Sequence, residues 1–283
     1  MNTKTEIHPL QKKHTTLYPL RTYLELYVLL IRTSIKSSMQ YKLNFFLGSF
    51  LAAFIQIAEF LMIAIVLHRF GAIQGWNIYE VGYLFAIMTL SKTVYRSIAN
   101  EVHHLEKYLV SGDMDQLLTR PLPVLFTLLP QRFRIMLGEW LQGGFVFGWS
   151  IHGMMNNGQI GWIALPQSLF VILTGAVLLF SIGLATATIG FWTTRISELQ
   201  TFTEDAAGTA ARFPLSLYPN WLAGMLLFVL PVGLVNYVPA LYILRGEWGP
   251  WIFIVILFAA MGFLAVSLRF WKFGMTKYQS TGS

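Results

Sequence analysis

Six apolar runs follow one another along this chain, and they constrain its fold more than any other feature. A hydrocarbon core of about 30 Å needs ~20 apolar residues per helix. The runs cover about 43–67, 79–99, 135–151, 162–192, 218–235 and 251–271. Only 12% of the 283 residues are charged, which is about half the share found in soluble domains. We therefore expect an all-α integral membrane protein with six transmembrane helices in a single domain over 17–283, after a polar tail at 1–16.

Two regions depart from simple spans. The fifth run belongs to a longer apolar region, 213–244, that contains Pro231 and Pro239, so we expect one span over 218–235 followed by a broken or re-entrant piece. Residues 17–36 alternate apolar and charged positions at helical spacing. They predict an amphipathic helix lying in the membrane interface, with a seventh span as the alternative.

The basic residues predict the orientation. Of the 20 Lys and Arg residues, only Arg69 and Arg245 fall on the side opposite the termini. Positive charge marks cytoplasmic segments, so we expect a multi-pass plasma-membrane protein with both termini cytoplasmic. Lys92 and Arg96 are interpreted as anchors at the cytoplasmic end of the second span. Basic residues flank the apolar runs and do not form one face, which argues against nucleic acid as a partner.

The stretch 195–212 is polar and joins the fourth span to the fifth. It contains the adjacent acids Glu204 and Asp205. We expect it to be a solvated cytoplasmic connector, with a contact to a soluble partner as the alternative.

A polar loop at 111–121 separates the second and third spans. Ser111 or Asp113 can cap a short helix over 114–119, because a side-chain oxygen accepts free backbone N–H groups there. Pro121 prevents the helix from continuing. We expect this helix to present Met114, Leu117 and Leu118 to a soluble partner. The alternative is a solvated loop without a partner.

Few polar side chains lie within the spans, and each can be functional or structural. Glu59, with Gln56 one turn earlier, could face a cationic cargo, or it could bond another helix or reach the outer interface. Glu139 is expected to pair with the nearby Arg132 and Arg134. Two pairs of small residues permit close helix packing or a dimer seam: Gly144 with Gly148, and Gly183 with Ala187.

No catalytic or metal-binding pattern is present. The chain has no Cys, and adjacent His103 and His104 point in different directions on a helix, which suits a shared metal poorly. The phosphate-binding pattern GxxxxGK[ST] is also missing. We therefore predict no catalytic residues, no metal site and no ATPase site in this chain.

Several segments resemble the ABC-2 type permeases, the membrane subunits of a class of ATP-binding-cassette transporters. The segment Ser-Gly-Asp-Met-Asp-Gln-Leu-Leu-Thr-Arg-Pro at 111–121 resembles a family motif, G-x-L/M-D-x-x-L-x-R-P. The segment Gln-Tyr-Lys-Leu-Asn-Phe at 40–45 is similar to the family's approach to span one, and the proline-rich part at 230–240 to its region after span five. The closest subgroup is a two-permease family that includes viologen-exporter permeases.

This resemblance implies a transport subunit and not an enzyme. The loop helix would be the coupling helix that docks on separate ATPase subunits, which bind the ATP and Mg²⁺. Its contact residues would be Gly112, Asp113, Met114, Asp115, Leu117, Leu118 and Arg120. A second permease, a paralogue or a second copy, and membrane lipid would be the other partners. We expect export of an amphipathic or cationic compound; the alternatives are export of a lipid or glycan, or an integral-membrane lipid-modifying enzyme.

Overall fold

The structure, a computed structural model, describes residues 20–279 except 71, 132 and 134. The polar tail at 1–16 lies outside the described residues. Most of the described residues are helical. The extended structure among them is a single bridge between Ile73 and Trp76. The expected all-α class is therefore confirmed.

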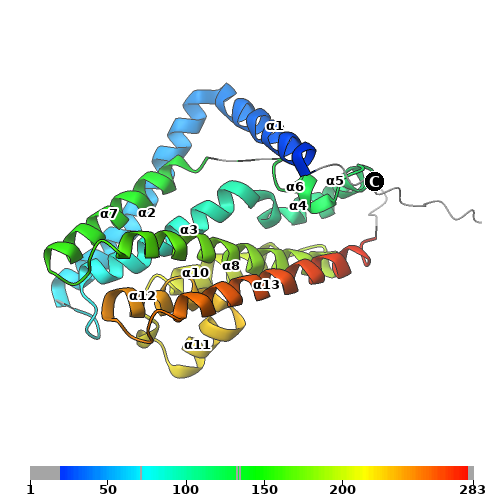
Figure 1. Cartoon of the computed structure of the whole chain (residues 1–283). Coiled ribbons are helices and arrows are strands. Elements are labelled where there is room, and N and C mark those ends of the chain that lie inside the picture. Colours follow the sequence, from blue (N-terminus) through cyan, green and yellow to red (C-terminus); the bar gives the residue numbers. More distant parts are fainter. Residues whose placement is uncertain (1–19, 71, 132, 134, 280–283) are drawn as a thin grey trace, which may run out of the picture.

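Five long helices form the body of the molecule. They are α2 (Lys42–Phe70), α3 (Ile78–His103), α7 (Leu137–Asn156), α8 (Ala164–Thr193) and α13 (Ile252–Met275). Helix α8 packs between α3 and α13, and α3 packs on its other side against α7 (Figure 1). The Tyr83 hydroxyl and Ser168 Oγ, 2.8 Å apart, join α3 to α8. Ser267 Oγ donates to the Ser181 carbonyl at 2.7 Å and joins α13 to α8.

Apolarity alone identifies only part of this bundle as membrane-spanning. Among the described residues, three stretches are long and apolar enough to cross a bilayer: Ile31–Leu67, which includes most of α2, then α8 and α13. Helices α3 and α7 have 26 and 20 residues, which is enough length, but they carry more polar side chains. A bent pair of shorter helices gives up to four spans, so the expected count of six stays a prediction.

The chain between α8 and α13 is the most irregular part of the molecule. Its elements are α9 (Ser197–Gln200), η2 (Thr201–Ala206), α10 (Ala207–Ala210), η3 (Leu215–Leu217), α11 (Asn220–Gly224), η4 (Met225–Val229), η5 (Pro231–Leu234) and α12 (Tyr237–Arg245).

The single helix expected over 218–235 is wrong. Helical structure ends at Leu230, and the next segment, which begins at Pro231, is bent from it by 73°. Proline at this position cannot donate the backbone hydrogen bond that would continue the helix. Buried Asn236 holds the returning chain, because its side-chain amide donates to the Leu84 carbonyl at 3.1 Å and to the Ala211 carbonyl.

The two ends of the bundle differ. One end, called the α5 end here, carries the short helices α4 (Leu105–Ser111), α5 (Asp113–Leu118) and α6 (Val124–Leu128), together with the end of α13. Figure 1 places these helices together at the right, opposite α12.

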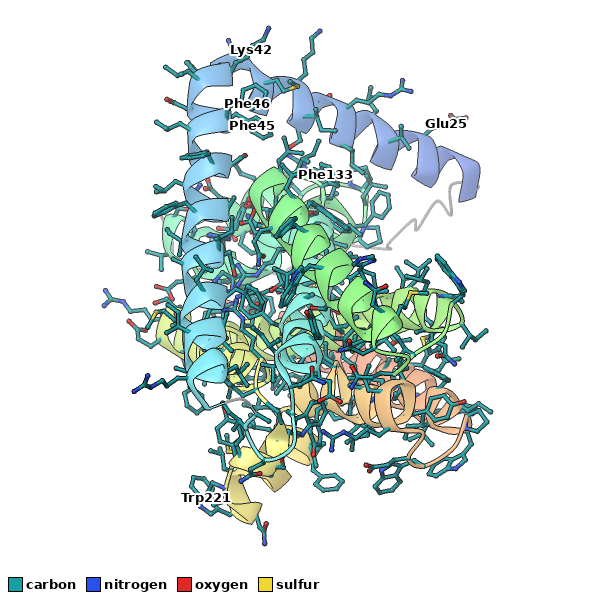
Figure 2. All side chains as sticks on the ribbon, turned by 90° about the vertical axis from the view of Figure 1, so that its left-hand side faces the viewer. Glu25, Lys42, Phe45, Phe46, Phe133 and Trp221 are labelled. Carbon is teal, nitrogen blue, oxygen red and sulfur yellow. The ribbon has the colours of Figure 1, made fainter. Side chains whose placement is uncertain are left out.

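Helix α1 (Leu20–Ser38) meets α2 at an elbow formed by Met39–Tyr41. Lys42 lies at the corner of this elbow, and Phe45, Phe46 and Phe133 lie inside it (Figure 2). Ser34 Oγ donates to the Phe133 carbonyl at 3.1 Å. A helix is therefore present in this region, and both its amphipathic character and its position in the membrane interface stay predictions.

Candidate functional site

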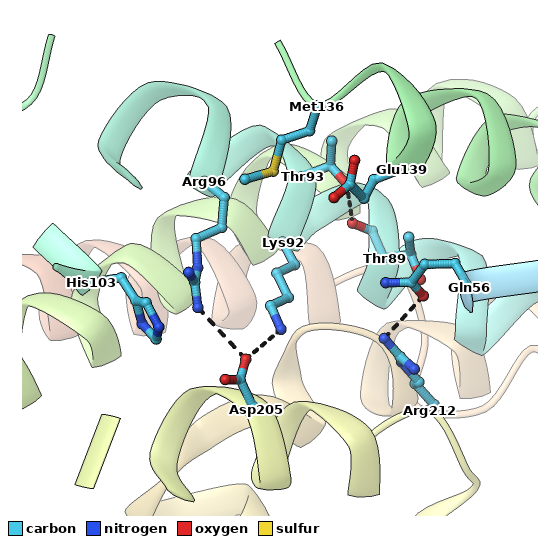
Figure 3. Close-up of a pocket in the computed structure, with 10 residues that line it drawn as sticks. All are labelled: Gln56, Thr89, Lys92, Thr93, Arg96, His103, Met136, Glu139, Asp205 and Arg212. Atoms are coloured by element: carbon cyan, nitrogen blue, oxygen red, sulfur yellow. Dashed lines mark hydrogen bonds and ion pairs between the residues drawn. The ribbon is translucent and has the colours of Figure 1, made fainter. Parts of the chain in front are cut away.

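A polar cavity of about 230 Å³ lies between α2, α3, the start of α7 and the 205–212 segment, and we call it the central cavity. Charged and polar side chains from all four elements point into it (Figure 3). The lining residues are Gln56, Thr89, Lys92, Thr93, Arg96, His103, Met136, Glu139, Asp205 and Arg212. Such a concentration of charge inside an otherwise apolar bundle is costly and marks a candidate functional site.

Helix α3 supplies two cations and the 201–206 segment supplies their partners. Lys92 and Arg96 lie four residues apart and therefore on one face of α3. Lys92 Nζ lies 2.6 Å from an Asp205 carboxylate oxygen, and the Arg96 guanidinium lies 3.6 Å from the same oxygen (Figure 3). Arg96 also lies 3.2 Å from Glu204, which is only 3% exposed. Lys92 and Arg96 therefore pair with acids inside the chain, which their interpretation as anchors did not predict, and their position at the cytoplasmic end of a span stays a prediction.

Glu204 is the most connected acid of the site. Its carboxylate accepts a hydrogen bond from the Tyr95 hydroxyl at 3.1 Å, in addition to the Arg96 contact. His103 Nδ1 lies 3.0 Å from its other oxygen. Gln200, Thr203, Glu204 and Arg212 are all buried. The expected solvated connector at 195–212 is therefore wrong, because its helical part returns along α3 and α8 and buries one polar face.

The local geometry of this segment is unusual. Residues 201–206 form a π-helix, in which hydrogen bonds join residues five apart. The wider turn reduces the angle between successive side chains, and it lets the neighbouring acids Glu204 and Asp205 both contact α3. π-Helical turns often occur at functional sites.

A second ion pair lies toward the other end of the cavity. Arg212 pairs with Glu59, donates to the Gln56 side-chain oxygen at 3.3 Å, and lies 4.8 Å from the centre of the Phe85 ring. Arg212, which the charge count placed at the cytoplasmic side, thus meets α2 well inside that helix. Gln56 lines the cavity, whereas Glu59 is not among the lining residues and is neutralised by Arg212. These contacts support a structural role for Glu59, in which its carboxylate binds another segment of the same chain.

Glu139 differs from the other acids of the cavity. It enters from the start of α7, on the side opposite Asp205 (Figure 3). No hydrogen-bond or ion-pair partner of Glu139 is found among the described residues. Arg132 and Arg134, its expected partners, lie outside the described residues.

Helix α5 lies at the predicted position, but its apolar residues divide between two faces. Met114 and Leu117 are buried in the main core with Leu184 and Phe191 of α8, whereas Leu118 is 42% exposed. The expectation that all three face a partner is wrong. The helix begins at Asp113 after Gly112 in a left-handed conformation (φ 76°). Ser111 Oγ lies 3.4 Å from the Asp113 amide and contributes a weak contact there.

Two further contacts at the α5 end were not predicted. Tyr278, after α13, lies edge-to-face against Phe191, and burial together with the nearby Asp115 carboxylate raises the pKa of its hydroxyl to about 12. Glu106 on α4 accepts hydrogen bonds from the Ile196 amide at 2.6 Å and the Ser197 amide at 2.7 Å. These hydrogen bonds lower the pKa of Glu106, the one from Ile196 most. They tie α4 to the start of α9.

A second cavity, of about 490 Å³, opens between α4 and α9, and we call it the end cavity. Its lining residues are His103, His104, Glu106, Lys107, Val110, Ser111, Ser197, Gln200 and Thr201. His103 lines both cavities.

The predicted small-residue pairs behave differently. A side chain at Gly183 would collide with the Tyr95 hydroxyl, and Ala187 is fully buried, so this pair lets α8 pack closely against α3. Gly144 and Gly148 have open space around them within this chain. Their expected role in helix packing is therefore wrong within the subunit, and a seam with a partner stays a prediction.

A comparison with protein families agrees with this architecture. The family model described as "ABC-2 family transporter protein" matches residues 53–282. A search of curated proteins finds no match. The family match covers α3, α5, the charged cavity and the broken segment before α13, as well as most of α2. The chain therefore belongs to the ABC-2 transporter family and is a multi-pass membrane protein.

Proposed function

We propose that this chain is the permease subunit of an ATP-driven exporter. It would form a translocation path with a second permease, either a paralogue or a second copy, and would be driven by separate ATPase subunits that bind ATP and Mg²⁺. The α5 end would face the cytoplasm of a cell whose plasma membrane holds the complex. Family membership supports the transport role, and the following contacts support the route of coupling.

The proposal rests mainly on the way α5 is packed against the rest of the chain. Met114 and Leu117 bury one face of α5 in the main core, where α5 packs against α4 and α6, and α4 in turn packs against α8. The opposite side, with Gln116, Leu118 and Arg120, is exposed. A force on that side would therefore be passed to the bundle and not absorbed by a loose loop.

The contacts of α4 suggest where the force would go. Helix α4 follows α3 directly, and Glu106 on α4 holds the start of α9. Helix α3 and the segment after α9 provide both sides of the Lys92–Asp205 and Arg96–Glu204 pairs. A displacement of α5 would thus reach the walls of the central cavity, which we propose as part of the cargo path.

Cargo recognition is the least constrained part of the proposal. Gln56 and Glu139 line the central cavity. Because Arg212 neutralises Glu59, the Glu59 carboxylate does not favour a cationic cargo. An amphipathic or cationic compound stays a proposal, with lipid or glycan as the alternative.

The coupling role can be tested with the purified chain and a candidate ABC ATPase subunit. We expect Leu118→Arg to weaken assembly and permease-stimulated ATP hydrolysis by about tenfold or more, because a charge would enter an apolar docking contact. The matched control is Leu199→Arg on α9, also an exposed leucine, for which we expect less than about a twofold change. Equal activity of Leu118→Arg and the unaltered chain would reject α5 as the coupling helix.

A further inference from the structure

One side chain separates the two polar cavities. His103 lies at the end of α3 and lines both the central cavity and the end cavity. The end cavity opens at the α5 end, between α4 and α9. The imidazole can therefore exchange protons with water on one side while it contacts the intramembrane charges on the other.

Charges of both signs surround the central cavity. Among the described residues, its cations are Lys92, Arg96 and Arg212, and the acids that line it or pair with these cations are Glu59, Glu139, Glu204 and Asp205. Glu204 is the most deeply buried of these acids, with only 3% of its side chain exposed. A carboxylate away from water is strongly unfavourable without positive partners, so a further positive charge next to Glu204 would stabilise it.

His103 is placed to provide that charge. Its Nδ1 lies 3.0 Å from Glu204, and the Glu204 carboxylate is almost fully buried. Histidine is the side chain that gains or loses a proton between pH 5 and 8. A proton taken up by the ring from water leaves Nδ1–H donating to Glu204 and adds one positive charge to the cluster.

We propose that His103 is a proton-binding site, filled from the end cavity, and that the bound proton stabilises the buried Glu204 carboxylate beside the central cavity. Proton uptake at the α5 end then fixes the 201–206 segment against α3, because the His103 imidazolium and the Arg96 guanidinium, both on α3, bind the Glu204 carboxylate of that segment. Loss of the proton removes the positive charge next to Glu204 and loosens this contact.

Several other charged groups surround the imidazole. Glu204 and Asp205 on the 201–206 segment favour the protonated form, whereas Arg96 on α3 and Lys107 on α4 oppose it. Glu106 on α4 is occupied by the backbone amides of Ile196 and Ser197. Gln200 also faces the end cavity and is uncharged. Among these interactions, the direct contact between the His103 ring and Glu204 is the closest.

The neighbouring histidine gives a matched control. His104 lines only the end cavity of the two, and its Nδ1 lies 3.0 Å from the backbone carbonyl of Asn100. The two rings are 5.3 Å apart, so they share solvent, salt and protein environment. A proton at His104 adds nothing to the Glu204 contact.

The binding site is tested on the full chain in lipid nanodiscs by ¹⁵N-histidine NMR, with no ATPase present. His103→Gln and His104→Gln identify the two signals. We expect the His103 ring to titrate, and Glu204→Gln to lower its titration midpoint by about one pH unit or more, as loss of a paired carboxylate does. The His104 midpoint should move by less than about half as much. A His103 ring that stays neutral from pH 5 to 9, or a midpoint unaffected by Glu204→Gln, overturns the proposal.

A second experiment addresses the role in transport, and only this part rests on the proposed function. Hydrolysis by the reconstituted complex is measured from pH 6 to 8, where the protonated fraction of a titrating group changes by up to tenfold per unit. We expect activity to fall several-fold with rising pH in the unaltered chain and in His104→Gln, and by less than about twofold in His103→Gln. His103→Arg, which keeps a positive charge, should also lose the pH dependence. Equal pH profiles for the two glutamine variants overturn the link to transport. Absence of any permease-stimulated hydrolysis rejects the proposed function. In that case the NMR result alone decides whether His103 binds a proton.

Discussion

Helices α3 and α13 have similar lengths, 26 and 24 residues, and opposite surroundings. Helix α13 is apolar, and only 22% of its most apolar window is buried within the chain. Helix α3 is too polar to be recognised by the same criterion, yet nearly all its residues from Glu80 to Val102 are buried. Apolarity in this molecule therefore does not report how deeply a helix is buried, since the equally apolar α8 has 67% of its most apolar window buried. A charged helix is stable at the centre because other segments of the same chain pair its charges.

The largest contrast between the two helices should come from removing an arginine. Arg96→Ala on α3 leaves Glu204 without its arginine partner, and we expect the free energy of unfolding to fall by about 3–5 kcal/mol. Arg269→Ala on α13 removes an exposed arginine, and its effect should stay within about 0.5 kcal/mol. SDS-induced unfolding in mixed micelles measures both. Similar losses for the two variants would show that α3 charges are no better paired than those of α13.

The reverse change tests the lipid-facing side of α13. Phe258 is 73% exposed, so Phe258→Arg places an unpaired charge in lipid, at a cost of about 2.5–3.5 kcal/mol near the helix centre. We expect less inserted protein, measured as the membrane-integrated fraction in vesicles. Normal insertion of this variant would mean that another protein surface covers Phe258.

Glycine substitutions at buried and at open positions should also differ in their effect on the free energy of unfolding, and this difference should be smaller. Gly183 faces the Tyr95 hydroxyl across the α8–α3 contact, whereas Gly262 on α13 has open space around it. Gly183→Ala should cost about 1–3 kcal/mol through overpacking. Gly262→Ala should be neutral or stabilising by up to about 1 kcal/mol, because alanine favours the helix. The same unfolding assay compares them, and a stabilising Gly183→Ala would reject the close packing.

The smallest effect concerns the contact between α4 and the start of α9. Glu106→Gln weakens the hydrogen bonds to the start of α9, and we expect a loss of about 0.5–2 kcal/mol, as for helix caps. Because the folded pKa of Glu106 lies below its ordinary value of 4.5, its contribution is present above pH 4.5 and is lost as pH falls through the lower folded value. The difference between Glu106→Gln and the unaltered chain should therefore shrink in acid. A constant difference down to pH 3 would contradict this.

Sequence patterns recognised the most apolar helices and missed the internal pairing. Helices α2, α8 and α13 are apolar over most of their length, which is a local signal. The pairs Lys92–Asp205 and Arg96–Glu204 join residues more than 100 positions apart, and nothing near either residue in the sequence reports its partner. The acids at 204–205 therefore looked solvated, although they face two cations on α3.

The short helix α5 shows a different limit. Its position followed from Gly112 and Pro121, which restrict the chain locally. The spacing of Met114, Leu117 and Leu118 predicted an apolar face, but the same spacing suits burial in the chain's own core or contact with a partner. The structure assigns Met114 and Leu117 to the core and leaves Leu118 outside.

The most direct measurement tests whether the 197–212 segment returns into the bundle. The chain has no cysteine, so pairs can be introduced without background. Thr186 Oγ1 on α8 and Thr203 Oγ1 lie 3.1 Å apart and are buried, whereas Thr201, two residues earlier, is exposed. We expect Thr186→Cys with Thr203→Cys to form a disulfide on oxidation, and Thr186→Cys with Thr201→Cys to remain reduced and react with a membrane-impermeant maleimide. No cross-link in the first pair, with equal maleimide labelling at 201 and 203, would contradict the internal charge cluster and restore the solvated connector.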